Sequence, residues 1–251
     1  MKLFACDYDG TLSQDGGVDA DTLRAIRDYQ ERGGLFGICS GRDPGSLKSE
    51  LAACGLKCDF LIMMNGSRIE CGGACVREHV LEGFEKALPL LRERCLFFSM
   101  TGDGELCLCP PDFRLEEPGE QAYMERLRTQ YRPVSRPEEM RVVYQISCRT
   151  PDQASAVALA EKLHGLGLDA FPNWEYVDIV PPGVSKAEAV AFVAGRYGVA
   201  GQDIYTAGDG RNDMEMLSRF GGFAIEYAEE CVRRAAGRTV RTVGQALRQL
   251  G

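Results

Sequence analysis

Histidine and tryptophan are scarce in this sequence, which holds two histidines, His79 and His164, and one tryptophan, Trp174, among 251 residues. Neither histidine lies in a motif, so the sequence offers little support for histidine-based phosphotransfer or hydrolysis. No apolar run approaches the roughly 20 residues that cross a bilayer. The charge at Asp7 also comes too early for a secretory signal. We therefore expect a cytoplasmic protein without a membrane partner.

Basic residues are also outnumbered, because 29 Lys and Arg against 37 Asp and Glu give a net charge of -8. Proteins that bind nucleic acid favour a basic face, so we expect no nucleic-acid partner. An acidic protein binds an anion only where a metal ion or a lysine reverses the local potential. A site for an anionic ligand should therefore combine carboxylates with a lysine.

Cysteine, by contrast, is abundant, with eleven residues. Without a secretory signal we expect reduced thiols rather than a disulfide framework. The pairs Cys54/Cys58 and Cys71/Cys75 have gaps that suit zinc ligands. No ribbon-like sequence surrounds them, so a zinc site is not favoured.

Four short apolar runs alternate with helical stretches, which indicates an α/β protein with a parallel sheet. These runs cover residues 3–6, 35–39, 60–64 and 204–207. In such sheets the ligand crevice lies outside the carboxyl ends of the strands.

A polar residue follows each of these runs. They are Asp7, Ser40, Asn65 and Asp209. Any one of them alone is compatible with an ordinary turn after a strand, and for Ser40 or Asn65 alone the turn is the preferred interpretation. Four at the same edge of one sheet favour a site.

Lys186 lies at a predicted helix start, with Ser185 as the N-cap and Glu188 as its capping-box partner. A cation in the first helical turn is poorly placed relative to the helix dipole, which suggests an anion nearby. A solvated surface lysine is the alternative. Asn212 and Asp213 open a later helix, where both are also ordinary capping residues.

Asp7 and Asp9 follow the first strand two residues apart, an arrangement that can direct a nucleophile and a proton carrier into one pocket. Gly10 would let the backbone turn closely around an anion. An aspartate approaches a phosphate dianion only if a cation screens the repulsion, and Mg²⁺ held by carboxylates and water does so. The residues thus favour phosphoryl transfer.

Four motifs resemble those of the haloacid dehalogenase (HAD) superfamily. They are DYDGT at 7–11, CSGR at 39–42, GVSK at 183–186 and GDGRND at 208–213. The resemblance is closest to its Cof-type phosphatases, which carry a large α/β cap of the C2B type, and it covers essentially the whole chain. It implies a Rossmann-like, doubly wound parallel-sheet core from residues 1–66 and 183–251, with an inserted α/β cap domain at 67–182.

The resemblance also implies catalytic and metal-binding roles. Asp7 would be the nucleophile and a ligand of Mg²⁺. Asp9 would be the general acid and base, and its backbone carbonyl would bind the metal. Asp209 would bind the metal directly, whereas Asp213 would contact the groups that bind the metal rather than the metal itself.

A second implied set binds the phosphate, and it comprises Thr11, Ser40, Asn65, Lys186 and Asn212. The role of Arg42 remains open, because it could bind substrate or pair with a surface carboxylate. In the insertion, Trp174 would be half-buried in the sheet, or it would stack on a sugar.

The expected function is therefore a Mg²⁺-dependent phosphomonoester hydrolase that forms an aspartyl-phosphate. Its substrate would be a small phosphorylated metabolite, in the first place a sugar phosphate. The alternative enzyme is a sugar phosphomutase resembling phosphomannomutase, and a non-catalytic phospho-acceptor domain ranks far below. We expect a monomer or a weak homo-oligomer.

Overall fold

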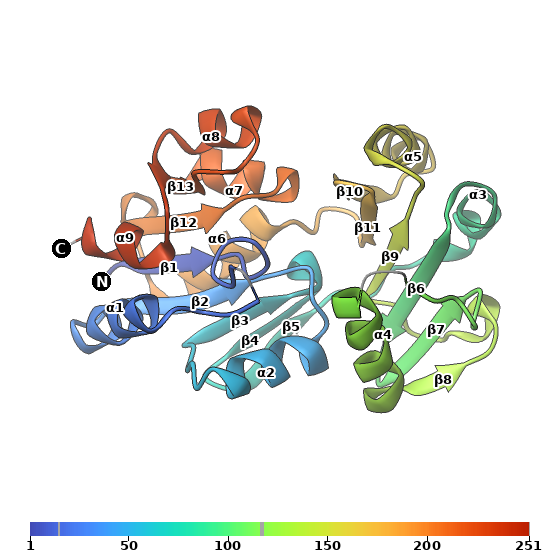
Figure 1. Cartoon of the computed structure of the whole chain (residues 1–251), viewed down its shortest axis with the longest axis horizontal. Helices are drawn as coiled ribbons and strands as arrows, with labels where there is room; N and C mark the ends of the chain where they lie inside the picture. The colour runs from blue at the N-terminus through green and yellow to red at the C-terminus, as the bar shows by residue number, and fades with distance from the viewer. Residues whose placement is uncertain (15, 116–117, 251) are drawn as a thin grey trace. The chain divides into compact units, whose positions relative to one another are not determined.

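The computed structural model describes residues 1–14, 16–115 and 118–250, and the chain forms two compact units (Figure 1). The first unit comprises Met1–Gly41, Glu50–Arg77 and Ser185–Gly251, and the second comprises Arg42–Ser49 and Glu78–Val184. The second unit thus interrupts the first at two places along the chain, and its longer segment is Glu78–Val184.

An eight-stranded sheet organises the first unit, in the order β14-β13-β12-β1-β2-β3-β4-β5. Its parallel strands are β1 (Leu3–Cys6), β2 (Leu35–Cys39), β3 (Phe60–Met63), β12 (Ile204–Gly208), β13 (Gly221–Ile225) and β14 (Thr239–Val240). The predicted α/β fold with a parallel sheet is confirmed.

The parallel strands are apolar on both faces because helices cover them. All four residues of β1 are buried. The ring of Phe4 lies 6.0 Å from that of Phe36 in β2 and 6.1 Å from that of Phe223 in β13. The helices of this unit are α1 (Ala20–Glu31), part of α2 (Pro44–Ala53), α6 (Lys186–Tyr197), α7 (Met214–Arg219), α8 (Glu230–Ala236) and α9 (Val243–Arg248).

The hairpin around Gly72 and Gly73 lies within residues 67–182, the range that the resemblance assigns to the inserted domain. In the structure, β4 (Arg68–Cys71) pairs antiparallel with β3, and β5 (Ala74–Glu78) forms the sheet edge beyond it. The first unit consequently runs to Arg77. The domain division at 66/67 and 182/183 stays a prediction.

The second unit contains a six-stranded sheet in the order β10-β11-β9-β6-β7-β8. The strands are β6 (Phe97–Gly102), β7 (Glu105–Cys109), β8 (Arg132–Val134), β9 (Gln145–Arg149), β10 (Asp169–Asn173) and β11 (Tyr176–Val180). Its pairs are antiparallel except β7 with β8.

Helices cover this second sheet unequally. Side chains of α3 (Leu88–Arg94) and α5 (Gln153–Gly165) join one face in a large apolar cluster. Helix α4 (Pro118–Gln130) packs through Met124 and Leu127 against Phe97, Leu106 and Leu108 on the opposite face. The same face also carries the buried polar residues Ser99, Thr101 and Gln145, so it is only partly apolar.

Two local features of the second unit involve Pro89 and Trp174. Helix α3 begins at Leu88, and Pro89 occupies its first turn, where no backbone N–H is required. Trp174 is not half-buried in the sheet. It lies in the turn between β10 and β11 with φ at +53° and 57% of its surface exposed.

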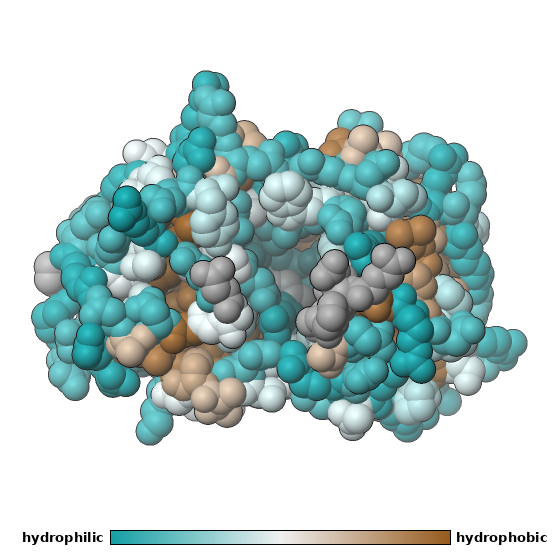
Figure 2. Space-filling view, viewed as in Figure 1, coloured by the Kyte–Doolittle hydropathy of each residue, from teal (hydrophilic) through white to brown (hydrophobic). Residues whose placement is uncertain are grey.

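Among the described residues, no helix is both long and apolar enough to cross a membrane. The visible face of each unit is mostly hydrophilic, and hydrophobic residues appear on it as separate patches (Figure 2).

Candidate active site

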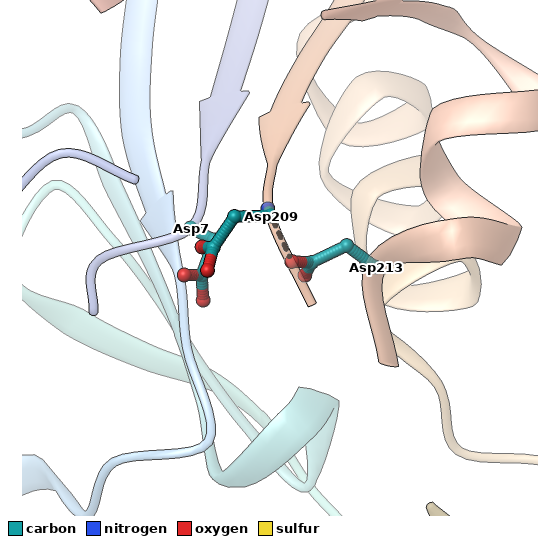
Figure 3. A group of neighbouring side chains, drawn as sticks. All are labelled: Asp7, Asp209 and Asp213. Atoms are coloured by element: carbon teal, nitrogen blue, oxygen red, sulfur yellow. Dashed lines mark hydrogen bonds between the residues drawn. The ribbon is translucent and has the colours of Figure 1, made fainter. Parts of the chain in front are cut away.

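Asp7 and Asp209 follow adjacent parallel strands, β1 and β12, so the two residues lie at the same edge of the sheet. The N–H of Asp7 donates to the carbonyl of Ala207 at 2.9 Å, which continues the pairing of the strands. The carboxylates of Asp7 and Asp209 point toward each other (Figure 3). The predicted convergence of these strand ends is therefore present in the fold.

Asp213 completes a group of three carboxylates with Asp7 and Asp209. One oxygen of each lies within 4.8 Å of the others. Asp213 Oδ2 accepts the N–H groups of Asp209 at 3.1 Å and Gly210 at 3.0 Å. These bonds fix the loop after β12, so Asp213 orients Asp209.

Lys186 supplies the positive charge of the group. It begins α6, and the predicted N-cap Ser185 accepts the N–H of Glu188 at 3.2 Å, whereas the Glu188 carboxylate forms an ion pair with Arg219. Its Nζ donates to Asp7 Oδ1 and to Asp213 Oδ1, both at 2.7 Å. Lys186 is only 3% exposed, so the surface-lysine alternative is wrong.

Two glycines allow the carboxylates to approach the backbone. Gly10 has φ at +81°, and a Cβ there would lie 2.5 Å from Asp209 Oδ2. A Cβ on Gly208 would lie 2.6 Å from the carboxylate of Asp213. We did not single out Gly208 from the sequence, although its place before Asp209 at a strand end was a usable signal.

Burial and like charge control the protonation of this group. Burial, followed by the neighbouring carboxylates of Asp213 and Asp209, raises the pKa of Asp7 well above its usual value against the opposing effect of Lys186. Burial is also the main reason why the pKa of Asp209 is raised to about 6. Burial opposes the charge on Lys186, but Asp213 and Asp7 outweigh it and raise the lysine's pKa.

The donor set of this group fits a hard divalent cation. Carboxylate oxygens are the ligands that Mg²⁺ and Ca²⁺ prefer. A cation between Asp7 and Asp209 would relieve the repulsion among the carboxylates, which adds to the effect of burial in raising both pKa values. Among the described residues, no comparable group forms around the cysteine pairs considered for zinc, and the eleven cysteines are free thiols.

Ser40 and Asn65 lie next to each other, at the ends of β2 and β3. The N–H of Ser40 donates to Ile62 at 2.9 Å, and the N–H of Asn65 donates to Ser40 at 3.0 Å. Both residues are buried. Asn65 adopts the left-handed conformation, with φ at +54°, which asparagine tolerates better than most residues.

Other predicted residues have different surroundings. Thr11 Oγ1 donates to Asp209 Oδ1 at 2.5 Å. Asn212 is half-buried beside Asp213, whereas Asp9 is exposed and its carboxylate is not part of the group of three. Arg42 donates from Nη1 to Ser46 Oγ at 3.0 Å.

The chain is similar to known proteins over almost its whole length. The family model of haloacid dehalogenase-like hydrolases matches residues 4–245. The 5-amino-6-(5-phospho-D-ribitylamino)uracil phosphatase YwtE of Bacillus subtilis is 25% identical over 245 residues, which cover 86% of this chain and 84% of YwtE.

Two solved structures show the same fold. The HAD subclass IIB sugar phosphatase BT4131 has a TM-score of 0.84 at 20% identity, covering 100% of this chain and 99% of its own. The phosphatase BT1666 from Bacteroides thetaiotaomicron has a TM-score of 0.78 at 24% identity, with 100% and 95% covered. The chain belongs to the haloacid dehalogenase-like hydrolase family.

Proposed function

We propose that this hydrolase is a Mg²⁺-dependent phosphomonoester phosphatase that forms a phosphoryl intermediate on Asp7. The observation that carries the proposal is the buried Asp7 carboxylate, held 2.7 Å from Lys186 beside Asp209 and Asp213. A carboxylate in that position combines a nucleophile with a fixed positive charge, as transfer of a phosphoryl dianion requires.

The reaction proceeds in two steps. A carboxylate oxygen of Asp7 attacks phosphorus, the ester P–O bond breaks, and Asp9 gives its proton to the leaving oxygen. Asp9 then takes a proton from water, whose oxygen attacks phosphorus and breaks the bond to Asp7. Inorganic phosphate leaves, Asp7 regains its carboxylate, and Asp9 regains its proton.

The remaining proposed residues hold the phosphoryl group and the metal. Lys186 neutralises charge on Asp7 and on the phosphoryl oxygens, and Ser40 and Asn212 donate hydrogen bonds to those oxygens. Thr11 and Asn65 support these contacts. Asp7, Asp209 and the carbonyl of Asp9 would hold Mg²⁺, which would supply charge neutralisation, and Asp213 orients Asp209.

The proposed substrate is a small phosphorylated metabolite that carries hydroxyl groups. Two similarities support this class. YwtE is named for a phosphoribitylamino substrate, and BT4131 is described as a sugar phosphatase. A sugar phosphomutase is the alternative that the sequence leaves open.

Release of phosphate from p-nitrophenyl phosphate tests the proposal. We expect activity in Mg²⁺, its loss in excess chelator, and a loss of at least about 10³-fold in Asp7→Asn. Asp28→Asn, an exposed site on α1, is the matched control and should behave as wild type. Full activity of Asp7→Asn would exclude Asp7 as the nucleophile, and full activity in chelator would exclude the metal.

A screen of phosphorylated metabolites separates the hydrolase from the mutase. A hydrolase releases inorganic phosphate in proportion to the substrate consumed. A mutase instead returns an isomeric sugar phosphate and releases little phosphate.

A further inference from the structure

The loop after β12 carries Asp209 and Asp213, and hydrogen bonds within the loop hold its base. Asp213 Oδ2 accepts the N–H of Asp209 at 3.1 Å (Figure 3) and that of Gly210 at 3.0 Å. These bonds do not involve the side chain of Arg211, which opens the short helical turn Arg211–Asp213. The conformation of the middle of the loop therefore depends on the contacts that Arg211 makes elsewhere.

Arg211 forms a two-point ion pair with Glu229, which lies in the loop after β13. Arg211 Nε donates to Glu229 Oε1 at 3.0 Å, and Arg211 Nη2 donates to Glu229 Oε2 at 2.6 Å. Two N–H···O bonds of this kind fix the relative orientation of the two groups as well as their distance. Because β12 and β13 are neighbouring parallel strands, the pair joins two loops at the same edge of the sheet.

The geometry and burial of this pair differ from those of an ordinary surface ion pair. Most exposed ion pairs contribute little unless their geometry is bidentate. The side chains of Arg211 and Glu229 are 40% and 28% exposed, so both are partly withdrawn from water. By contrast, Arg234 and Glu230, which form an ion pair within α8, are 78% and 67% exposed. The Arg211–Glu229 pair is therefore the better suited of the two to hold a loop in place.

The loop after β13 is itself held firmly. Arg233 Nη1 donates to the carbonyls of Glu226 at 2.9 Å and Ala228 at 2.8 Å. Arg241 Nε donates to the Glu226 carboxylate at 3.2 Å. Ala228 is buried in an apolar cluster with Val232 of α8. The ion pair thus ties the loop after β12 to a part of the unit whose backbone is fixed by other contacts.

The position of Glu229 also favours a role other than helix capping. Glu229 occupies the N-cap position of α8, where a side chain that accepts from the first helical N–H groups stabilises a helix. Its side chain forms no such bond, and its carboxylate accepts from Arg211 instead. The stability of α8 therefore does not account for a carboxylate at this position, whereas the contact with the neighbouring loop does.

We propose that Arg211 and Glu229 are positioning residues for the metal site, because their ion pair sets the conformation of the loop that presents Asp209 and Asp213. This inference rests on the proposed function, in which Asp209 would hold Mg²⁺. Neither Arg211 nor Glu229 touches the metal or the substrate in this role, and both act through the backbone of the loop. A metal ligand binds well only when the contacts behind it hold it in place.

The affinity for Mg²⁺ in two neutral variants separates positioning from simple charge. The full chain is titrated with Mg²⁺ alone, without substrate, and the rise in Tm gives the Kd. Positioning predicts that Arg211→Gln and Glu229→Gln each raise this Kd about three- to tenfold. Charge alone predicts opposite signs, because removing a cation tightens Mg²⁺ binding and removing an anion weakens it. A merely structural pair would lower the Tm without Mg²⁺ and leave the Kd unchanged. A lower or unchanged Kd in Arg211→Gln would overturn the proposal.

A double variant and a control pair complete the test. Arg211→Gln combined with Glu229→Gln should have a Kd within about twofold of the single variants, because each of them already lacks the pair. Arg234→Gln and Glu230→Gln, which break the exposed pair of α8, are the matched controls and should stay within about twofold of wild type. Multiplied losses in the double variant, or equal losses in the controls, would overturn the proposal. A wild-type protein that binds no Mg²⁺ would overturn the proposed function and this inference with it, so the two failures are distinguishable.

Discussion

The side-chain nitrogen of Lys186 lies 2.7 Å from Oδ1 of Asp7, although the two residues are separated by 179 positions in the sequence. Both side chains are buried. The same nitrogen donates to Asp213 Oδ1 at 2.7 Å. One lysine therefore forms ion pairs with two of the three carboxylates.

Replacing this lysine should impair both activity and stability. Lys186→Met would leave Asp7 and Asp213 without their counter-charge, and breaking a buried ion pair costs about 3 to 5 kcal/mol. We expect the free energy of unfolding, measured in urea without added metal, to fall by that amount. We also expect kcat/KM to drop about 10²-fold or more. Lys162→Met, an exposed site on α5, should stay within about 0.5 kcal/mol. A Lys186→Met protein as active as wild type would contradict the role given to this charge.

Gly10→Ala should weaken metal binding by displacing Asp209. Gly10 and Gly16 both have φ at +81°, but only the Cβ of residue 10 would meet the carboxylate, and that of residue 16 would meet nothing within 4 Å. Both variants incur the backbone strain, of about 1 kcal/mol. We expect the Mg²⁺ concentration for half-maximal activity to rise at least about tenfold in Gly10→Ala alone. Equal shifts in both variants would mean that strain, rather than the contact with Asp209, causes the effect.

Metal binding should strengthen as pH rises through about 6. The pKa of Asp209 is raised to about 6, so below that pH the carboxyl is neutral and binds Mg²⁺ poorly, while above it the carboxylate is available. The raised pKa of Asp7 acts in the same direction. We expect the increase in Tm caused by Mg²⁺ to grow between pH 5 and pH 7, and to be reduced in Asp209→Asn. A Mg²⁺ effect that falls over this range would contradict the assignment.

Loss of the Asp9 carboxyl should matter most for poor leaving groups. Asp9→Asn cannot give a proton to the departing oxygen, and general acid catalysis contributes about 10²- to 10⁴-fold. We expect kcat for an alkyl phosphate to fall by that amount. For p-nitrophenyl phosphate, the rate of the transfer step, measured as the pre-steady-state release of nitrophenol, should fall much less. Equal losses would exclude Asp9 as the acid.

The positions of these strands along the chain, and of the polar residues that follow them, could be predicted because both are local features. Asp7 and Asp209 follow short apolar runs, and parallel pairing of β1 with β12 brings such ends to one edge. The N-cap at Ser185 was also readable, because capping depends on a few adjacent residues. The hairpin at β4 and β5 was assigned to the insertion, because its local pattern does not reveal that β4 pairs with β3.

The sequence by itself determined the α/β class, the family resemblance and the residues that carry the proposed chemistry, because these depend on periodicity and on contiguous motifs. Only the tertiary structure decided that one buried lysine joins Asp7 to Asp213, and that Asp9 is exposed outside the group of carboxylates. It also decided which side chains of β6, β9 and β11 share a face, because that follows from the register of these strands. Register and burial depend on contacts between distant segments, which local sequence patterns do not specify.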